Sequence, residues 1–302
     1  VAYFISNLIQ KNNLNTLNKL FEKIELSKPK FSELLKFATI ITHSFYSLNE
    51  KRALTIYSDL IKHESFRNTV PLLYIDYSHL RGIYFKVLML IKKQSPVKSD
   101  LFFVALMEFY RQFYTEGICE NQDIKRPETF STFNPVLKGR FYSYKIILSS
   151  AVDSSLKKEL FKECRTTKVS WFLEEVIPAL LIKEEYKILT KLSDKFYEQI
   201  FESDYWSDNT VSSIYLIALA NINWYANNIS MAKGNLELVV LDKIELGYYD
   251  YVALFYYQTK IKISHLEGDE ITNTASFLIL EKLVLKTGFI KFLEISKKHL
   301  LN

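Results

Sequence analysis

The chain has 302 residues, of which 48% are hydrophobic and 24% charged, proportions that are ordinary for a globular protein. Its two cysteines, Cys119 and Cys164, lie far apart, and none of its five histidines has metal-ligand spacing. The sequence therefore predicts neither a disulfide framework nor a metal site. The 22 phenylalanines and 20 tyrosines, set against 7 glycines and 6 prolines, favour helices packed on helices.

The net charge of +5 is distributed unevenly along the chain. Residues 1–150 contain 21 Lys and Arg against 13 Asp and Glu, whereas residues 151–302 contain 18 against 21. A basic first half could attract nucleic acid or an acidic partner. Only 7 of the 39 basic residues are arginine, however, and arginine is the better reader of bases and phosphates. If nucleic acid binds, its affinity should fall steeply with salt.

Helical spacing of apolar residues predicts the elements of the first half. The first clear helix covers residues 14–24, and Pro29 prevents its continuation. Further helices are expected over residues 31–48, 50–63, 71–93 and from residue 99 or 100 to 116, where Gly117 ends the last one. The apolar run that begins at Leu101 ends after seven residues, so no membrane span is expected.

The stretch Cys119–Pro135 has two prolines, many polar residues and no periodicity. Irregular stretches of this length are uncommon in compact domains and are often functional. We therefore expect a basic helical-hairpin region over residues 1–118, a linker or lid-like insertion over 119–135, and a helical-repeat region over 136–302. In the alternative arrangement, these parts form one continuous solenoid.

In the second half, every predicted element is again a helix, because no segment alternates with a two-residue period. Pro178 is expected to kink its helix or restart it, and Asp153 is expected to cap the helix that follows it. The predicted helices cover residues 136–152, 154–164, 169–182, 184–201, 211–226, 229–244, 248–267, 270–286 and 289–300.

The segment Leu219–Val239 resembles a tetratricopeptide repeat. The matching residues are Leu219, Ala220, Ala232 and Leu236, whereas Asn223 and Val239 depart from the family pattern and no proline ends the unit. The resemblance implies an all-α, right-handed superhelix of antiparallel hairpins, an α-solenoid that is tetratricopeptide-like in the C-terminal half. The two alanines would let the backbones of the paired helices approach closely.

In that family the first helix of each unit lines a concave binding face. The resemblance therefore implies a partner-binding surface that includes Ile217, Asn221 and Trp224, with Tyr257 and Lys260 on the next first helix. An asparagine can hydrogen-bond a peptide backbone, and a tryptophan can pack on its side chains. In the alternative interpretation, these residues only pack against neighbouring helices.

No phosphate-binding, nucleophile or kinase motif is present, so no catalytic residue and no cofactor is predicted. The resulting hypothesis is a cytoplasmic, non-enzymatic helical-repeat scaffold that binds a protein or peptide. It could form the regulatory part of a larger protein, since the chain starts at Val1 and leaves room for an upstream segment. The alternatives are a nucleic-acid-binding protein that uses the basic half, and an all-helical enzyme with a dispersed site.

Overall fold

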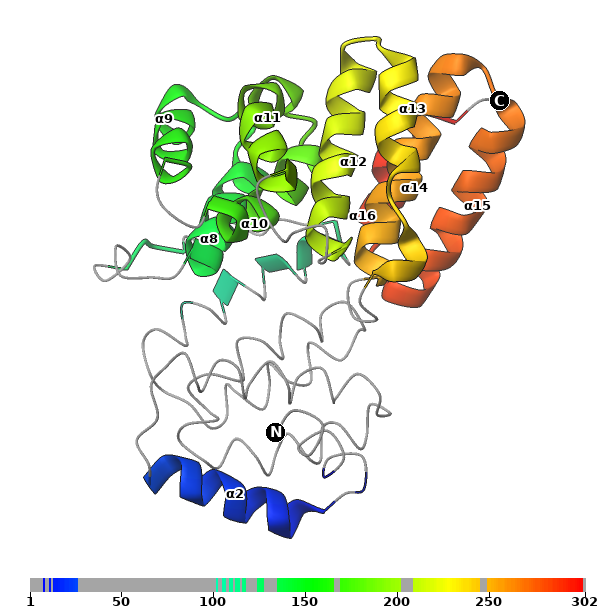
Figure 1. Ribbon diagram of the computed structural model, residues 1–302. Coiled ribbons are helices and arrows are strands. Elements are labelled where there is room, and N and C mark those ends of the chain that lie inside the picture. Colours follow the sequence, from blue (N-terminus) through cyan, green and yellow to red (C-terminus); the bar gives the residue numbers. More distant parts are fainter. Residues whose placement is uncertain are drawn as a thin grey trace. The chain divides into compact units, whose positions relative to one another are not determined.

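The computed structural model describes residues 8, 11, 13–26, 135–165, 169–201, 209–244 and 249–300, together with short pieces between 102 and 127 (Figure 1). The chain divides into two compact units, Val1–Glu108 and Phe109–Asn302. The helices predicted for residues 31–48, 50–63 and 71–93 lie outside the described residues. So does most of the stretch 119–135, and the predicted division of the chain at that stretch stays a prediction.

In the first unit, helix α2 spans Leu14–Leu26 and confirms the helix predicted at residues 14–24. The side chain of Asn13 accepts a hydrogen bond from the backbone N–H of Thr16 at 3.3 Å, which satisfies one of the open amides of the first turn. Leu17 is fully buried, whereas Glu22 and Lys23 are exposed, so one side of α2 faces the interior of this unit.

The described part of the second unit contains only helices as regular elements, which confirms the predicted all-α class. These are α8 (Pro135–Leu148), α9 (Ser154–Glu163), α10 (Val169–Ile182), α11 (Tyr186–Phe201), α12 (Asn209–Tyr225), α13 (Ile229–Glu237), the 3₁₀ helix η3 (Leu241–Lys243), α14 (Tyr249–Glu267), α15 (Glu270–Thr287) and α16 (Lys291–Lys297). No described helix combines the length and apolarity that a membrane span requires.

Short polar side chains begin several of these helices. Asp153 accepts from the N–H of Leu156 at the start of α9, as predicted, and Asn228 and Asp269 act in the same way at α13 and α15. At the other end of α15, Gly288 has a φ of +76°, a left-handed conformation that glycine adopts without steric cost.

Several predicted boundaries differ from the structure, and two of these differences have a clear cause in the backbone. Helix α11 begins at Tyr186 and not at residue 184, because Glu184 has a φ of +55° and cannot continue a right-handed helix. The helix predicted over residues 229–244 ends at Glu237, since Val240 is extended and a separate turn, η3, follows. Helix α10 has its predicted bounds, and of the two outcomes expected at Pro178 the helix does not restart there.

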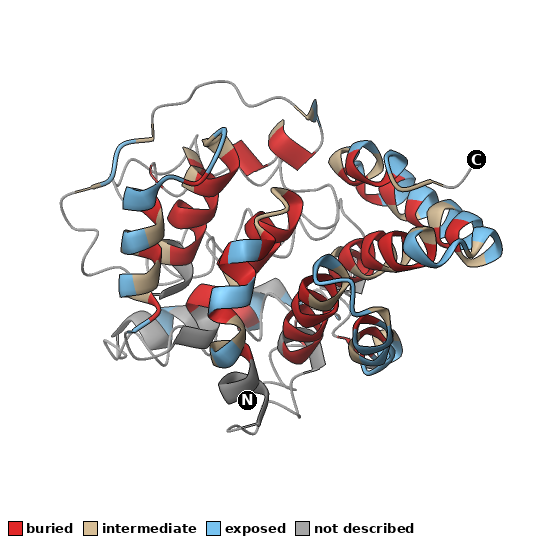
Figure 2. Cartoon of the chain, turned by 90° about the horizontal axis from the view of Figure 1, so that it is seen from above, coloured by how far each residue is buried: buried red, intermediate tan, exposed pale blue. Residues whose placement is uncertain are grey.

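The helices of the second unit pack in a regular order. From α10 to α16 each helix contacts the next one, and the even-numbered helices α8, α10, α12, α14 and α16 also contact one another in succession. Figure 1 shows the pairs α12–α13 and α14–α15 side by side as hairpins. Figure 2 shows that the buried residues of these helices face the neighbouring helices, while the exposed residues face outward. Each hairpin therefore buries its apolar face against the hairpins beside it.

Helices α8 and α10 approach closely at Gly139. A Cβ atom at this position would lie 2.8 Å from both the backbone oxygen of Phe172 and the Cβ of Glu175. Beside it, Arg140 donates to the Glu175 carboxylate at 3.0 Å and Ser143 donates to the Glu175 carbonyl oxygen at 2.6 Å. The small residue thus permits the approach, and the polar pairs satisfy the groups that the approach buries.

A matched pair of glycine substitutions tests this packing. Gly139→Ala should lower the free energy of unfolding by about 1–2 kcal/mol, because the added methyl group meets backbone atoms that cannot move aside. Gly234→Ala in α13 should raise it by up to about 1 kcal/mol, since nothing lies within 4 Å of its Cβ position and alanine is the better helix former. Urea denaturation measures both, and a stabilised Gly139→Ala variant would contradict the close approach.

Candidate functional site

Helix α14 is the element around which the candidate site is built. It contacts α12, α13, α15 and α16. Lys260 and Lys262 lie two positions apart on it, and residues at this spacing point to nearly opposite sides of a helix. Lys262 faces the interior with 1% of its surface exposed, whereas Lys260 is half-buried and lines a surface groove.

The Lys262 ammonium group is enclosed by polar and aromatic partners. Its Nζ donates to the hydroxyl oxygen of Tyr186 at 2.7 Å and lies 3.4 Å from the side-chain oxygen of Asn221. It also lies 5.3 Å from the ring centre of Tyr186 and 5.5 Å from that of Trp224. The negative faces of aromatic rings attract a cation, and this attraction grows when water is excluded.

Glu184, in the turn between α10 and α11, supplies the opposite charge. Its Oε1 lies 3.6 Å from the Nζ of Lys262 and 3.8 Å from the Nε2 of His299, while Oε2 accepts from Lys298. Burial alone would raise the pKa of this carboxyl group, but His299, Lys298 and Lys262 together lower it to about 2. The carboxylate is thus charged at neutral pH and ties the end of α16 to this turn.

Burial lowers the pKa of Lys262 to about 8, and the nearby Glu184 carboxylate opposes that shift. Trp224 closes the cluster by donating its indole N–H to the backbone oxygen of Lys262 at 2.9 Å, and its ring lies edge-on to that of His299. On the neighbouring helix α15, Asn273 donates to the carbonyl oxygens of Ile261 and His299, both at 3.0 Å. These contacts together hold α14 in place from its inner side.

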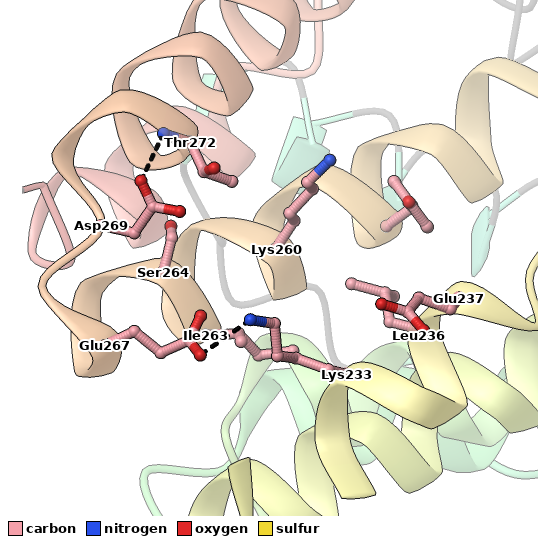
Figure 3. A pocket seen from close by; sticks show the side chains of 10 residues that line it. Lys233, Leu236, Glu237, Lys260, Ile263, Ser264, Glu267, Asp269 and Thr272 are labelled. Atoms are coloured by element: carbon pink, nitrogen blue, oxygen red, sulfur yellow. Dashed lines mark hydrogen bonds and ion pairs between the residues drawn. The ribbon is translucent and has the colours of Figure 1, made fainter. Parts of the chain in front are cut away.

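The outer side of α14 forms one wall of a groove with a volume of about 220 Å³ (Figure 3). The opposite wall is α13, and the start of α15 closes one end. We refer to it as the α13–α14 groove. Its lining residues are Lys233, Leu236 and Glu237 of α13, Tyr256, Lys260, Ile263, Ser264 and Glu267 of α14, and Asp269 and Thr272 at the start of α15.

Most polar groups of this groove are engaged within the chain. Lys233 pairs with Glu267 at 2.8 Å, and Asp269 accepts from the N–H of Thr272 at 3.0 Å, the two interactions drawn in Figure 3. Ser264 donates to the carbonyl oxygen of Ile261. By contrast, no hydrogen bond or ion pair joins the Lys260 ammonium group to any described residue.

Of the five residues predicted to bind a partner, only Lys260 lines the groove. Ile217 is fully buried, and Asn221 is 2% exposed and donates to Thr259 at 2.7 Å and to the carbonyl oxygen of Ile217 at 2.9 Å. Trp224 is half-buried in the Lys262 cluster. Tyr257 is half-buried, and its ring lies edge-on to that of its neighbour Tyr256.

The predicted orientation of Ile217 and Asn221 toward an open face is therefore corrected by the structure. The face of α12 that carries them packs against α14, because the even-numbered helices contact one another in succession. The sequence of one hairpin does not show which face of its first helix packs against the first helix of the next hairpin. Ile217 and Asn221 are instead buried, as the alternative interpretation expected, and Asn221 hydrogen-bonds Thr259 of α14.

The sequence nevertheless contains a signal for the groove. Tyr256, Lys260, Ile263, Ser264 and Glu267 follow one another at i, i+4, i+7, i+8 and i+11, which is one face of a helix. On α13 the residues Lys233, Leu236 and Glu237 have the spacing i, i+3 and i+4. Both stripes mix apolar and charged residues, and such a mixture is typical of a surface that is neither core nor fully solvated.

The chain was compared with known protein families, with curated proteins and with solved structures, and none of the three comparisons found a match. Within the described ranges, no group of three or more histidine, cysteine, aspartate or glutamate side chains could hold a metal ion. Function is therefore inferred from the groove and from the cluster that positions it.

The pH dependence of stability tests the enclosure of Lys262. Because its pKa is lowered to about 8 in the folded protein, the unfolded chain binds more protons between that value and the ordinary lysine pKa. The stability of the native chain should therefore rise with pH in this window. Between pH 7 and 9.5 the native chain should gain about 2 kcal/mol of unfolding free energy relative to Lys262→Met. Urea denaturation at both pH values measures this difference.

In this comparison the other titrating groups cancel, since both proteins contain them. An unchanged difference between the native chain and Lys262→Met across this pH range would show that the ammonium group is not desolvated in the folded protein.

Proposed function

We propose that the chain is a non-enzymatic helical-repeat scaffold of the α-solenoid type that binds a peptide or protein segment in the α13–α14 groove. The order of helix contacts supports this architecture. Each even-numbered helix from α10 to α14 contacts both the next even-numbered helix and the odd-numbered helix that follows it in the chain. Stacked helical hairpins make such contacts, because each unit touches mainly its neighbours.

The hairpin α12–α13 contains the segment that resembles a tetratricopeptide repeat. Ala220 and Ala232 are both completely buried in it. Asn228 caps α13 directly after the turn. These features agree with a right-handed, tetratricopeptide-like unit, in which small residues occupy the crossing of the paired helices.

The observation that carries the proposal is the α13–α14 groove itself. It lies between the hairpin α12–α13 and the next hairpin, α14–α15. Leu236 and Ile263 contribute apolar surface to the groove, and the charged residues Lys233, Lys260 and Glu237 also line it. A few polar groups around an apolar floor can orient a ligand, while the floor provides affinity.

An all-helical enzyme is the second candidate, and a specific observation favours it. A buried lysine with a lowered pKa beside a tyrosine hydroxyl and a carboxylate is a combination found at many active sites. The enclosure of Lys262 argues for the scaffold instead, because only 1% of its surface is exposed and its partners from the α10–α11 turn, α11 and α12 surround it.

Peptide selection followed by site-specific crosslinking tests the proposal. A phage-displayed library of random peptides is sorted on the immobilised chain, and the enriched peptides are synthesised with a label. The photoreactive substitution Tyr256→p-benzoylphenylalanine places the crosslinker in the groove. The same substitution at Tyr225, which is 49% exposed at the end of α12, is the control. Covalent adducts should form at position 256 and not at position 225.

Two results would contradict the proposal. Failure of the library to enrich any binding peptide would count against a peptide scaffold. Adducts at position 225 without adducts at position 256 would place the binding surface elsewhere on the second unit.

A further inference from the structure

We infer that the α13–α14 groove selects a peptide segment that carries an acidic side chain next to an aliphatic one. The carboxylate would pair with Lys260, and the aliphatic side chain would rest on Leu236 and Ile263. This inference rests on the proposed function, because it names the chemistry of the segment that the groove binds.

The charges of the groove point to an acidic ligand at one position. Two of its acidic side chains already have partners, since Glu267 pairs with Lys233 and Asp269 caps α15. Lys260 is half-buried, and no described residue forms a hydrogen bond or an ion pair with its ammonium group. A cation without a partner that stands in a groove can pair with an incoming carboxylate, and a lysine that already has a partner offers less.

The remaining acidic residue, Glu237, does not offer an equivalent site for a basic group. Its side chain is exposed, and its charge acts on Lys233 and raises the pKa of Tyr256, after the larger effect of burial. A basic ligand group at this position would compete with the lysine that is already there. Lys260 is therefore the position at which charge is least balanced within the groove.

The apolar part of the groove specifies the second feature of the ligand. Leu236 is 5% exposed and Ile263 is 3% exposed, so both mainly contribute the base of the hollow. The volume of about 220 Å³ is below the usual range for sites that hold whole drug-sized ligands. It suits one or two side chains of a longer segment, and aliphatic side chains match the surface of leucine and isoleucine.

The peptides enriched from the random library test this inference directly. They should share an aspartate or glutamate close to a leucine, isoleucine or valine. Fluorescence anisotropy with a labelled, enriched peptide should show roughly tenfold weaker binding to Lys260→Glu than to the native chain. Replacing the acidic residue of the peptide by lysine should weaken binding to the native chain by a similar factor. Combining the two changes should restore much of the affinity, since the charges are then exchanged.

Lys158→Glu on α9 is the matched control, because it makes the same charge change at an exposed lysine outside the groove. Thermal unfolding of Lys260→Glu, monitored by circular dichroism, should resemble that of the native chain. Groove-crosslinked peptides without a shared acidic residue, or equal binding by the native chain and Lys260→Glu, would overturn the inference and leave the scaffold proposal standing. If no enriched peptide crosslinks at position 256, the scaffold proposal itself is contradicted.

Discussion

A lysine ammonium group inside a helical unit must be given partners, and the arrangement around Lys262 meets that requirement. Removing a charge from water costs several kcal/mol unless an opposite charge and hydrogen bonds replace the lost hydration. Here Glu184 supplies the charge, Tyr186 accepts the hydrogen bond, and the ring of Trp224 covers one side. These partners come from the α10–α11 turn, from α11 and from α12, while the lysine belongs to α14. The need to give the buried Lys262 ammonium group its partners therefore constrains how α11, α12 and α14 are placed relative to one another.

This constraint also determines where the groove can form. The inner face of α14 is held by the Lys262 cluster and by Thr259, which accepts a hydrogen bond from Asn221. Because that face is committed to α12, the opposite face of α14 is turned toward α13. The groove lies on this opposite face, with Lys260 in its wall. A scaffold with a rigid inner layer can present a groove that needs little further ordering on binding, which favours affinity.

The backbone strain at Glu184 is also explained by the contacts of the Lys262 cluster. A glutamate with a φ of +55° is uncommon and costs roughly 1–2 kcal/mol relative to a right-handed conformation. The turn keeps this conformation because it directs the carboxylate toward Lys262, Lys298 and His299 at once. Removal of the carboxylate would leave three basic side chains near one another. The local strain is thus offset by the contacts that the conformation makes available.

Much of the second unit could be predicted from sequence because helices depend on local spacing and on caps. The end of α14 at Glu267 and the start of α15 at Glu270 match the predicted boundaries, since Gly268 and Asp269 provide a left-handed glycine and a capping carboxylate. Of the residues that line the groove, only Lys260 was among the binding residues predicted from the sequence. Asn221 and Trp224 have the composition of a binding surface, but their hydrogen bonds go to Thr259 and Lys262, which lie more than thirty residues further along the chain.

In the described part of the chain, the sequence by itself determined which segments form helices and which residues begin and end many of them, because these properties arise within a few residues along the chain. Only the tertiary structure decided that Lys262 is enclosed and Lys260 faces a groove, although the two differ by two positions on one helix. The direction in which each points depends on the helices that pack against α14. That packing is set by contacts between residues such as Glu184 and Lys262, which lie far apart in the chain.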